Sequence, residues 1–274
     1  MPAWHPHWDV LAVVVALGAF YLHAEWRIRP LIAPGLPAAT PRQRGLWFGA
    51  LAILAGSASW PFHDLAEQVF FSLHMVEHML VALVIPPLML MGAPRWMAEH
   101  LLTSPPGLRT LRLLCRPLPA FFLFHLSLAS MHWRPIVEAM VNSSLFHFAA
   151  HLWLFGVSIL MWLPVVSPTP LIPRLNPPLR MLYLFLHSII PTVPASFLTF
   201  SRSPLYPSYI DSASRFGMST VTDLQIAGLI MKLGGGLILW GAIVVIWFKW
   251  IASERTWDSI ERDLRRSSTP GVER

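Results

Sequence analysis

The sequence predicts an all-α polytopic integral membrane protein: one bundle of seven transmembrane helices, with the amino terminus outside and the carboxyl terminus in the cytoplasm. Three observations predict this fold. The 274 residues are 55% hydrophobic and only 12% charged, whereas soluble domains carry about 25% charged residues. Apolar stretches close to the ~20 residues that cross a bilayer recur along the chain. Basic residues gather in alternate connections between these stretches.

The apolar stretches give the expected spans in order, of which the second and fourth are short and interrupted by polar or aromatic residues. They are Val10–Trp26, Gly45–Phe62, Val69–Met91, Pro117–His132, Leu145–Val166, Leu179–Phe200 and Thr220–Trp250. A cleaved signal peptide carries positive charge before its apolar core. No Lys or Arg precedes Val10, so the first span is expected to be retained. Residues 1–252 are predicted to form the transmembrane domain and residues 253–274 a polar cytoplasmic tail.

The distribution of basic residues sets the predicted orientation. Of 20 Lys and Arg, 16 lie in alternate connections or in the tail: Arg27, Arg29, Arg42, Arg44, Arg95, Arg109, Arg112, Arg116, Arg174, Arg180, Lys249, Arg255, Arg262, Arg265, Arg266 and Arg274. The positive-inside rule places these connections in the cytoplasm. Contact with anionic lipid headgroups then accounts for the net charge of +6, so lipid is expected as a partner and nucleic acid is not.

Two histidine pairs with i,i+4 spacing lie inside apolar runs: His74 with His78, and His147 with His151. Residues four apart share one face of a helix. Ionisable side chains are costly in a membrane and usually face a bundle interior or a cavity. In the predicted topology both pairs lie in the outer half of the bilayer, with His74 and His78 about 8 and 14 Å deep at 1.5 Å per residue. We therefore predict that these four histidines form a metal or haem site.

Further polar residues are predicted as supporting groups or additional ligands. His132 closes the fourth span, Asp223 opens the seventh, and Met75 offers a thioether sulfur beside the first histidine pair. Glu77 and Lys232 are charges inside spans, and an ion pair between them would lower the cost of burying each. The sequence therefore predicts a Glu77–Lys232 pair.

The remaining candidates are given lesser roles. His63 and Asp64 are expected in an outer loop between the second and third spans, and His5 and His7 are interpreted as part of an interfacial amino terminus. Cys115 is the only cysteine, so no disulfide can form within the chain and no C-x-x-C metal motif exists. Any metal must therefore be held by imidazole, thioether or carboxylate groups.

Three kinds of chemistry fit the histidine pairs. His74, Glu77 and His78 match the H-x-x-E-H pattern of inverted zincins, with two imidazole ligands and a glutamate base. Paired histidines across a bundle could instead hold haem. Cu(I) accepts imidazole and thioether ligands and needs no thiolate. The residues alone leave copper and haem close, with zinc hydrolysis as a third alternative.

Several short motifs follow one another between about residues 45 and 250: His74-Met-Val-Glu-His-Met-Leu80, Pro86-Pro-Leu-Met-Leu-Met-Gly-Ala-Pro94, His147-x-x-x-His151, Met161-Trp-Leu-Pro164, Tyr183-Leu-Phe-Leu186, Phe197-Leu-Thr-Phe200, Pro204-Leu-Tyr206 and Asp223-Leu-Gln-Ile-Ala-Gly-Leu-Ile-Met231. In their order and spacing, these motifs resemble the CtaG family, which assists assembly of caa-type cytochrome c oxidase. His132, in Met131-His-Trp-Arg-Pro135, resembles a family Trp-His-x-Pro element less closely.

The resemblance implies a multi-span assembly factor in the bacterial plasma membrane. It implies no catalytic residues, Cu(I) as cargo, the oxidase catalytic subunit as partner, and an extracytoplasmic copper donor. The chain departs from the family pattern at three positions: Glu77 stands at a usual Gln, Leu224 replaces a Gln in an Asp-Gln-Gln element, and Lys232 stands at a usual aromatic. The first departure weakens the protease alternative, because its catalytic base would be a local variation.

Overall fold

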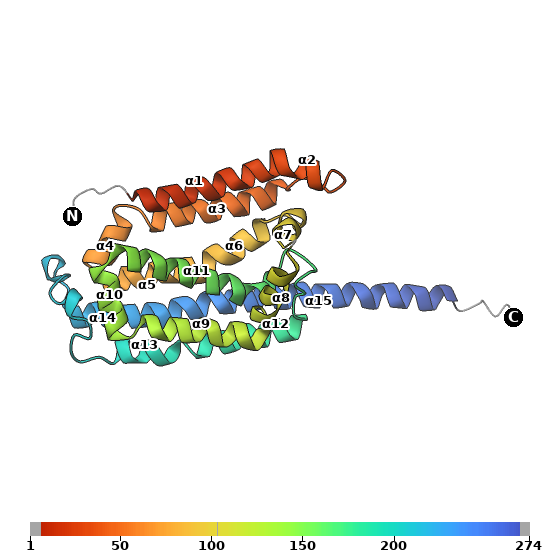
Figure 1. The fold of residues 1–274 in the computed structure, drawn as a ribbon. Coiled ribbons are helices and arrows are strands. Elements are labelled where there is room, and N and C mark those ends of the chain that lie inside the picture. Colours follow the sequence, from red (N-terminus) through yellow and green to blue (C-terminus); the bar gives the residue numbers. More distant parts are fainter. Residues whose placement is uncertain (1–6, 103, 269–274) are drawn as a thin grey trace.

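The computed structural model describes residues 7–102 and 104–268, and all regular structure in these two ranges is helical (Figure 1). The α-helices are α1 (Trp8–His23), α2 (Arg29–Ile32), α3 (Pro41–Ser57), α4 (Phe62–Gln68), α5 (Phe71–Met79), α6 (Ile85–Gly92), α7 (Arg95–Leu101), α8 (Pro105–Leu114), α9 (Pro117–Met131), α10 (Arg134–Asn142), α11 (Ser144–Val166), α12 (Pro177–Ile189), α13 (Thr192–Thr199), α14 (Thr220–Leu229) and α15 (Gly235–Ser268). The π-helical turns η1 (Ala24–Ile28), η2 (Leu80–Val84) and η5 (Ile230–Gly234) join consecutive helices, and η3 (Pro207–Tyr209) and η4 (Ser214–Phe216) are short 3-10 turns. The predicted all-α class is confirmed.

The structure contains five helical segments long and apolar enough to cross a membrane, so the protein is a multi-pass membrane protein. They are Trp8–Ile32, Phe71–Gly92, Ser144–Val166, Pro177–Thr199 and Thr220–Trp257. Two bent pairs, α3 with α4 at 49° and α8 with α9 at 72°, would raise the number to seven if each pair is one span. The predicted second and fourth spans, the two that polar or aromatic residues interrupt, coincide mainly with one helix of each pair, α3 and α9.

Local sequence explains where the helices begin. Prolines start four of them, where a missing N–H costs nothing because the first turn has no intrahelical partner; these are Pro41, Pro105, Pro117 and Pro177. Side-chain oxygens accept backbone N–H groups at four starts, namely Thr40, Ser143, Asn176 and Ser219. The loop expected at His63 and Asp64 was wrong, because these residues lie in helix α4. Two i,i+4 contacts, His63 with Glu67 and Asp64 with Gln68, support this helix.

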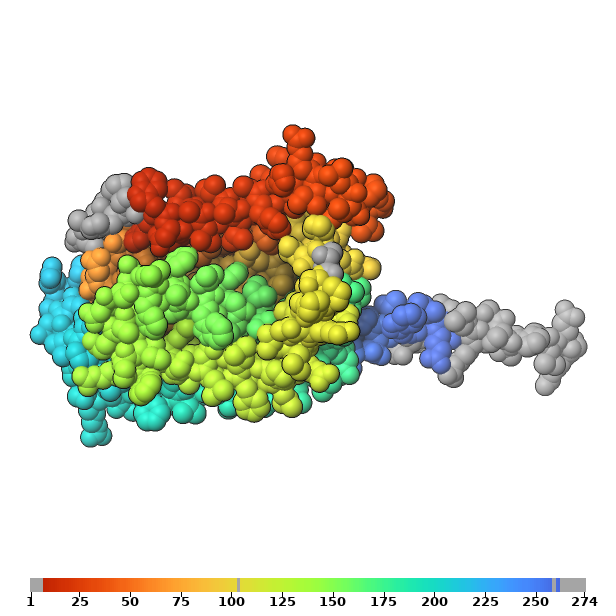
Figure 2. Space-filling model, in the orientation of Figure 1, coloured from red at the N-terminus to blue at the C-terminus, as the bar shows by residue number. Residues whose placement is uncertain are grey.

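The helices run roughly side by side, with α1 and α3 along one edge and α9, α12 and α13 along the other (Figure 1). We call the end that holds α4, α10 and the start of α14 the α4 end, and the opposite end, which holds α7 and α8, the α8 end. Of these five segments, Phe71–Gly92 is the most buried. Inside the protein, 72% of its apolar stretch is buried, against 17% for Thr220–Trp257. Helix α15 passes beyond the α8 end of the bundle (Figure 2), and the segment from Ser253 to Ser268, expected as a polar tail, continues it as helix.

A proline pair shapes the central span. Pro86 has no N–H to donate to the carbonyl of Ala82 four residues earlier, and the π-helical turn η2 ends two residues before it, at Val84. Trp162 of α11 donates from Nε1 to that carbonyl at 3.1 Å, so the freed acceptor stays satisfied. At the α8 end of this span, a Cβ on Gly92 would lie 2.7 Å from the backbone nitrogen of Trp47, so only glycine permits this approach of α6 to α3.

Candidate metal centre

Helices α5 and α11 place the two predicted histidine pairs opposite each other near the α4 end. Helix α11 begins where the Ser143 hydroxyl accepts the N–H of Phe146 at 3.3 Å, which puts His147 in its first turn and His151 one turn further. Helix α5 begins at Phe71, so His74 and His78 occupy the corresponding turns. His74, His78 and His147 are 4%, 1% and 7% exposed, so the pairs face the bundle interior.

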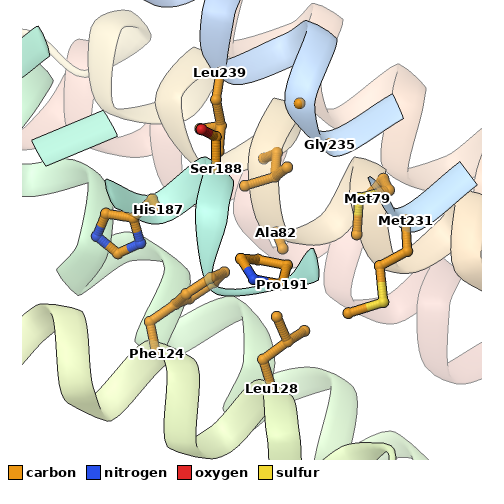
Figure 3. A pocket seen from close by; sticks show the side chains of 12 residues that line it. Met79, Ala82, Phe124, Leu128, His187, Ser188, Pro191, Met231, Gly235 and Leu239 are labelled. Atoms are coloured by element: carbon orange, nitrogen blue, oxygen red, sulfur yellow. The ribbon is translucent and has the colours of Figure 1, made fainter. Parts of the chain in front are cut away.

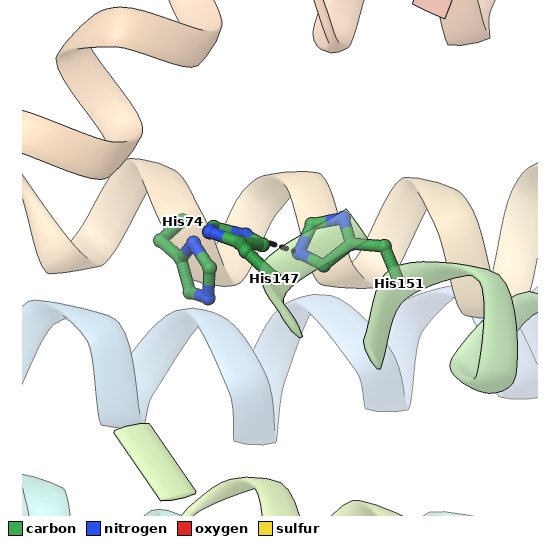
Figure 4. A group of neighbouring side chains, drawn as sticks. All are labelled: His74, His147 and His151. Carbon is green, nitrogen blue, oxygen red and sulfur yellow. Dashed lines mark hydrogen bonds between the residues drawn. The ribbon is translucent and has the colours of Figure 1, made fainter. Parts of the chain in front are cut away.

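The ring nitrogens converge on His151. Its Nε2 lies 3.2 Å from Nε2 of His78 and 2.9 Å from Nε2 of His147. Ligand nitrogens of His74, His147 and His151 all lie within 4.8 Å of one another (Figure 4). Ligands that form bonds of about 2.0 Å to one tetrahedral ion are separated by about 3.3 Å. The observed spacing therefore suits nitrogens that share one metal ion, and all four predicted histidines belong to the cluster.

Two carboxylates and one further histidine support the cluster. Glu67 of α4 lies 2.7 Å from Nδ1 of His147 and 3.2 Å from Nε2 of His63. Glu77 of α5 lies 2.9 Å from Nδ1 of His63 and 4.0 Å from Nδ1 of His151. A carboxylate can only accept, so His147 donates from Nδ1 and presents the lone pair of Nε2 to the cluster. This is the arrangement that orients metal-ligating histidines.

His63 lies between these two carboxylates, with Nε2 3.2 Å from Glu67 and Nδ1 2.9 Å from Glu77. Burying a cation is less costly where carboxylates lie nearby.

The predicted Glu77–Lys232 ion pair does not form. Glu77 is fully buried, and both of its oxygens lie within 3.0 Å of Nδ1 of His63. Lys232 lies in η5 with its side chain exposed. The long Lys stem can carry its ammonium toward an interface without a partner. Glu77 instead contacts His63 of α4, in the segment that was expected as a loop.

Asp223 holds the start of α5. Its oxygens accept the backbone N–H groups of Phe71 and Ser72 at 2.6 and 3.2 Å. These are two of the N–H groups that a helix leaves without intrahelical partners, and a negative charge is favourable there. Phe70, at the N-cap position, provides no side-chain cap. Asp223 therefore positions the helix that carries His74 and His78.

The other predicted candidates lie around the cluster in supporting places. Met75 is 2% exposed and belongs to the hydrophobic core. Nδ1 of His132 donates to the carbonyl of Leu128 at 2.7 Å, which leaves its buried Nε2 without a partner. The Tyr206 hydroxyl donates to the carbonyl of His132 at 3.0 Å. Burial raises the pKa of Tyr206 to about 12, so this donor keeps its proton at neutral pH.

The sequence analysis gave no role in the site to three residues that lie beside the cluster, namely His7, His63 and Glu67. His7, interpreted as interfacial only, lies 2.9 Å from Asp64, and its ring packs against His63 at 4.7 Å. His5 lies outside the described residues. Glu67 was not identified at all. The signal was present, because Glu67 follows His63 by four residues, but this spacing has meaning only on a helix and the segment was assigned to a loop.

Comparison with known proteins agrees with the resemblance noted from the motifs. The sequence model of one family, described as cytochrome c oxidase caa3 assembly factor (Caa3_CtaG), matches residues 19–253. No curated protein and no solved structure matches the chain. The matched range includes the four clustered histidines, Glu67, Glu77 and Asp223. The chain therefore belongs to the Caa3_CtaG family of cytochrome c oxidase assembly factors.

Proposed function

We propose that this assembly factor binds Cu(I) at His74, His78, His147 and His151 and delivers it to the catalytic subunit of the oxidase. The observation that carries the proposal is the convergence of the Nε2 atoms of His78, His147 and His151 at 2.9 and 3.2 Å, with the carboxylates of Glu67 and Glu77 beside them. Imidazole is a ligand that copper accepts.

Ligand exchange is the proposed delivery mechanism. The two pairs, one on each helix, form adjacent sites of low coordination, and the ion passes between them and then to the acceptor. His151 is the most accessible of the four, with 16% of its side chain exposed, so transfer would proceed from its side of the cluster. An extracytoplasmic copper donor would load the same site. Glu67 and Glu77 balance charge and orient the rings.

The proposed topology has seven spans in a bacterial plasma membrane, with the bent pairs α3–α4 and α8–α9 each counted as one span. Residues 1–252 form the membrane domain with the amino terminus outside, and residues 253–274 form a cytoplasmic tail in contact with the lipid surface. The α4 end, with the histidine cluster, then faces outward. The basic connections Arg95, Arg109, Arg112 and Arg116 lie at the other end, as the positive-inside rule requires.

Cysteine labelling tests this orientation. With Cys115 replaced by serine, an impermeant maleimide added to intact cells should label the Ser203→Cys variant, because this exposed position follows α13 near the α4 end. The Ser104→Cys variant, exposed between α7 and α8, should be labelled only after the membrane is opened. The reverse pattern would contradict the orientation, and labelling of both from one side would contradict the seven spans.

Metal analysis of the full-length protein in detergent tests the function. After anaerobic incubation with Cu(I), elemental analysis should find bound copper, and the visible spectrum should lack a Soret band. Glu77→Gln separates assembly from zinc hydrolysis: copper binding should persist in this variant, whereas a hydrolase would lose its general base. Bound haem, or no copper after loading, would refute the proposal.

A further inference from the structure

A second pair of histidines lies outside the cluster, between α9 and α12. The rings of His125 and His187 stack with centroids 4.7 Å apart and planes inclined by 30°. The two residues are 7% and 1% exposed. All four of their ring nitrogens are buried and have no hydrogen-bond partner. Buried polar groups without partners are rare and costly, so four such nitrogens in contact call for a ligand.

The surroundings offer these rings no protein partner. His125 packs against Phe121 at 4.5 Å, and His187 packs against Phe121 and Tyr183 at 4.9 and 4.3 Å. On α12, the Tyr183 hydroxyl donates instead to the carbonyl of Met161 at 3.1 Å and the Ser188 hydroxyl to the carbonyl of Phe185 at 2.7 Å. The aromatic walls hold both imidazoles in place while leaving their nitrogens free to bind a ligand.

A small cavity lies beside His187. It has a volume of about 20 Å³, enough for one water or one ion. His187 lies at one side of it, and Met79 and Met231 lie at the other (Figure 3). Met79 directly follows His78, a member of the cluster. The π-helical turns η2 and η5 begin beside these methionines, at Leu80 and Ile230, and such turns often mark functional sites.

The geometry points to a second Cu(I) site, held by His125 and His187 beside the methionine-lined cavity. The donors are two imidazoles with thioethers nearby, the set that suits Cu(I). None of the residues that line the cavity is acidic. A divalent ion would therefore keep its full charge in an apolar interior, whereas a monovalent ion carries the smallest penalty. This site lies outside the cluster and goes beyond the proposed function.

Stoichiometry tests the second site. Full-length protein in detergent, incubated anaerobically with excess Cu(I) and desalted, should retain two copper ions per chain. The double variant His125→Phe/His187→Phe keeps rings of similar shape and should retain one. His78→Ala/His151→Ala should also retain one, held by the second site. The matched control His100→Phe replaces an exposed histidine of α7 and should retain two.

The outcomes separate the two proposals. Two ions in the His125→Phe/His187→Phe variant, or none in His78→Ala/His151→Ala, would overturn the second site. Unchanged copper in His78→Ala/His151→Ala, with one ion lost from the phenylalanine variant, would overturn the cluster and leave the second site standing.

A purely structural role for the pair is tested by thermal unfolding. The copper-free phenylalanine variant should unfold at or above the wild-type temperature, because four unpartnered nitrogens are removed. Its stabilisation by added Ag(I), a probe that mimics Cu(I), should be reduced relative to wild type. Lower stability of the copper-free variant with unchanged Ag(I) stabilisation would overturn the proposal.

Discussion

Replacement of His151 by alanine is expected to leave the oxidase catalytic subunit without copper. Nε2 of His151 is the common neighbour of His78 and His147 at 3.2 and 2.9 Å, so its removal takes away the ligand at the centre of the cluster. Loss of groups that merely support metal ligands reduces affinity about 10–100-fold. Removal of the central ligand should therefore weaken Cu(I) binding by at least about 100-fold. Competition with a Cu(I) chelator measures the affinity, and the metal content of the purified oxidase measures delivery.

Two variants calibrate this result. Glu67→Gln keeps every imidazole and weakens the contacts of Glu67 with His147 at 2.7 Å and His63 at 3.2 Å, so a reduction of about 10–100-fold is expected. His100→Ala, on the exposed face of α7, should behave as wild type. If His151→Ala bound Cu(I) as tightly as Glu67→Gln, His151 would not be a ligand.

Replacement of Asp223 by alanine is expected to destabilise the protein by about 2–3 kcal/mol. The variant loses two charge-assisted hydrogen bonds at the buried start of α5, to Phe71 and Ser72, and each such bond is worth about 1.5–3 kcal/mol before the site relaxes. The same change should weaken Cu(I) binding, because His74 lies in the turn that this aspartate holds. Thermal unfolding in detergent, with and without Cu(I), measures both effects.

The controls for Asp223 separate the cap from its charge. Asp223→Asn retains one acceptor oxygen and should lose about half as much stability. Asp9→Ala removes an exposed first-turn aspartate from α1, where the helix dipole is worth less than about 1 kcal/mol. Equal destabilisation by Asp9→Ala and Asp223→Ala would contradict the capping role.

The sequence alone predicted the helical class and that each histidine pair shares one face of a helix, because i,i+4 spacing in apolar runs has a direct geometric meaning. It could not predict which charges meet across the bundle. Glu77 was assigned to Lys232 by depth, yet depth does not fix the rotation of a helix, and the partner is His63 on another segment. Asp223 shows the same limit, since its bonds reach residues more than 150 positions away.

The second histidine pair was missed for a related reason. His125 and His187 lie on different helices with no spacing rule between them, and each alone reads as an isolated membrane histidine. Only packing shows that their rings stack. The local error at α4 had a comparable cause: the break at residues 58–61 ended the apolar run, and the short helix after it, with Glu67, was not recognised.

The indole of Trp162 has a consequence beyond satisfying a carbonyl. It fastens α11 to the central span at Ala82, just past His78 along that span, while the imidazoles join the same two helices nearer the α4 end. Two attachment points at different heights fix both the axial offset and the rotation of one helix against the other. The histidine rings are thus preorganised in the metal-free protein, and little conformational entropy would be lost on binding of a metal ion.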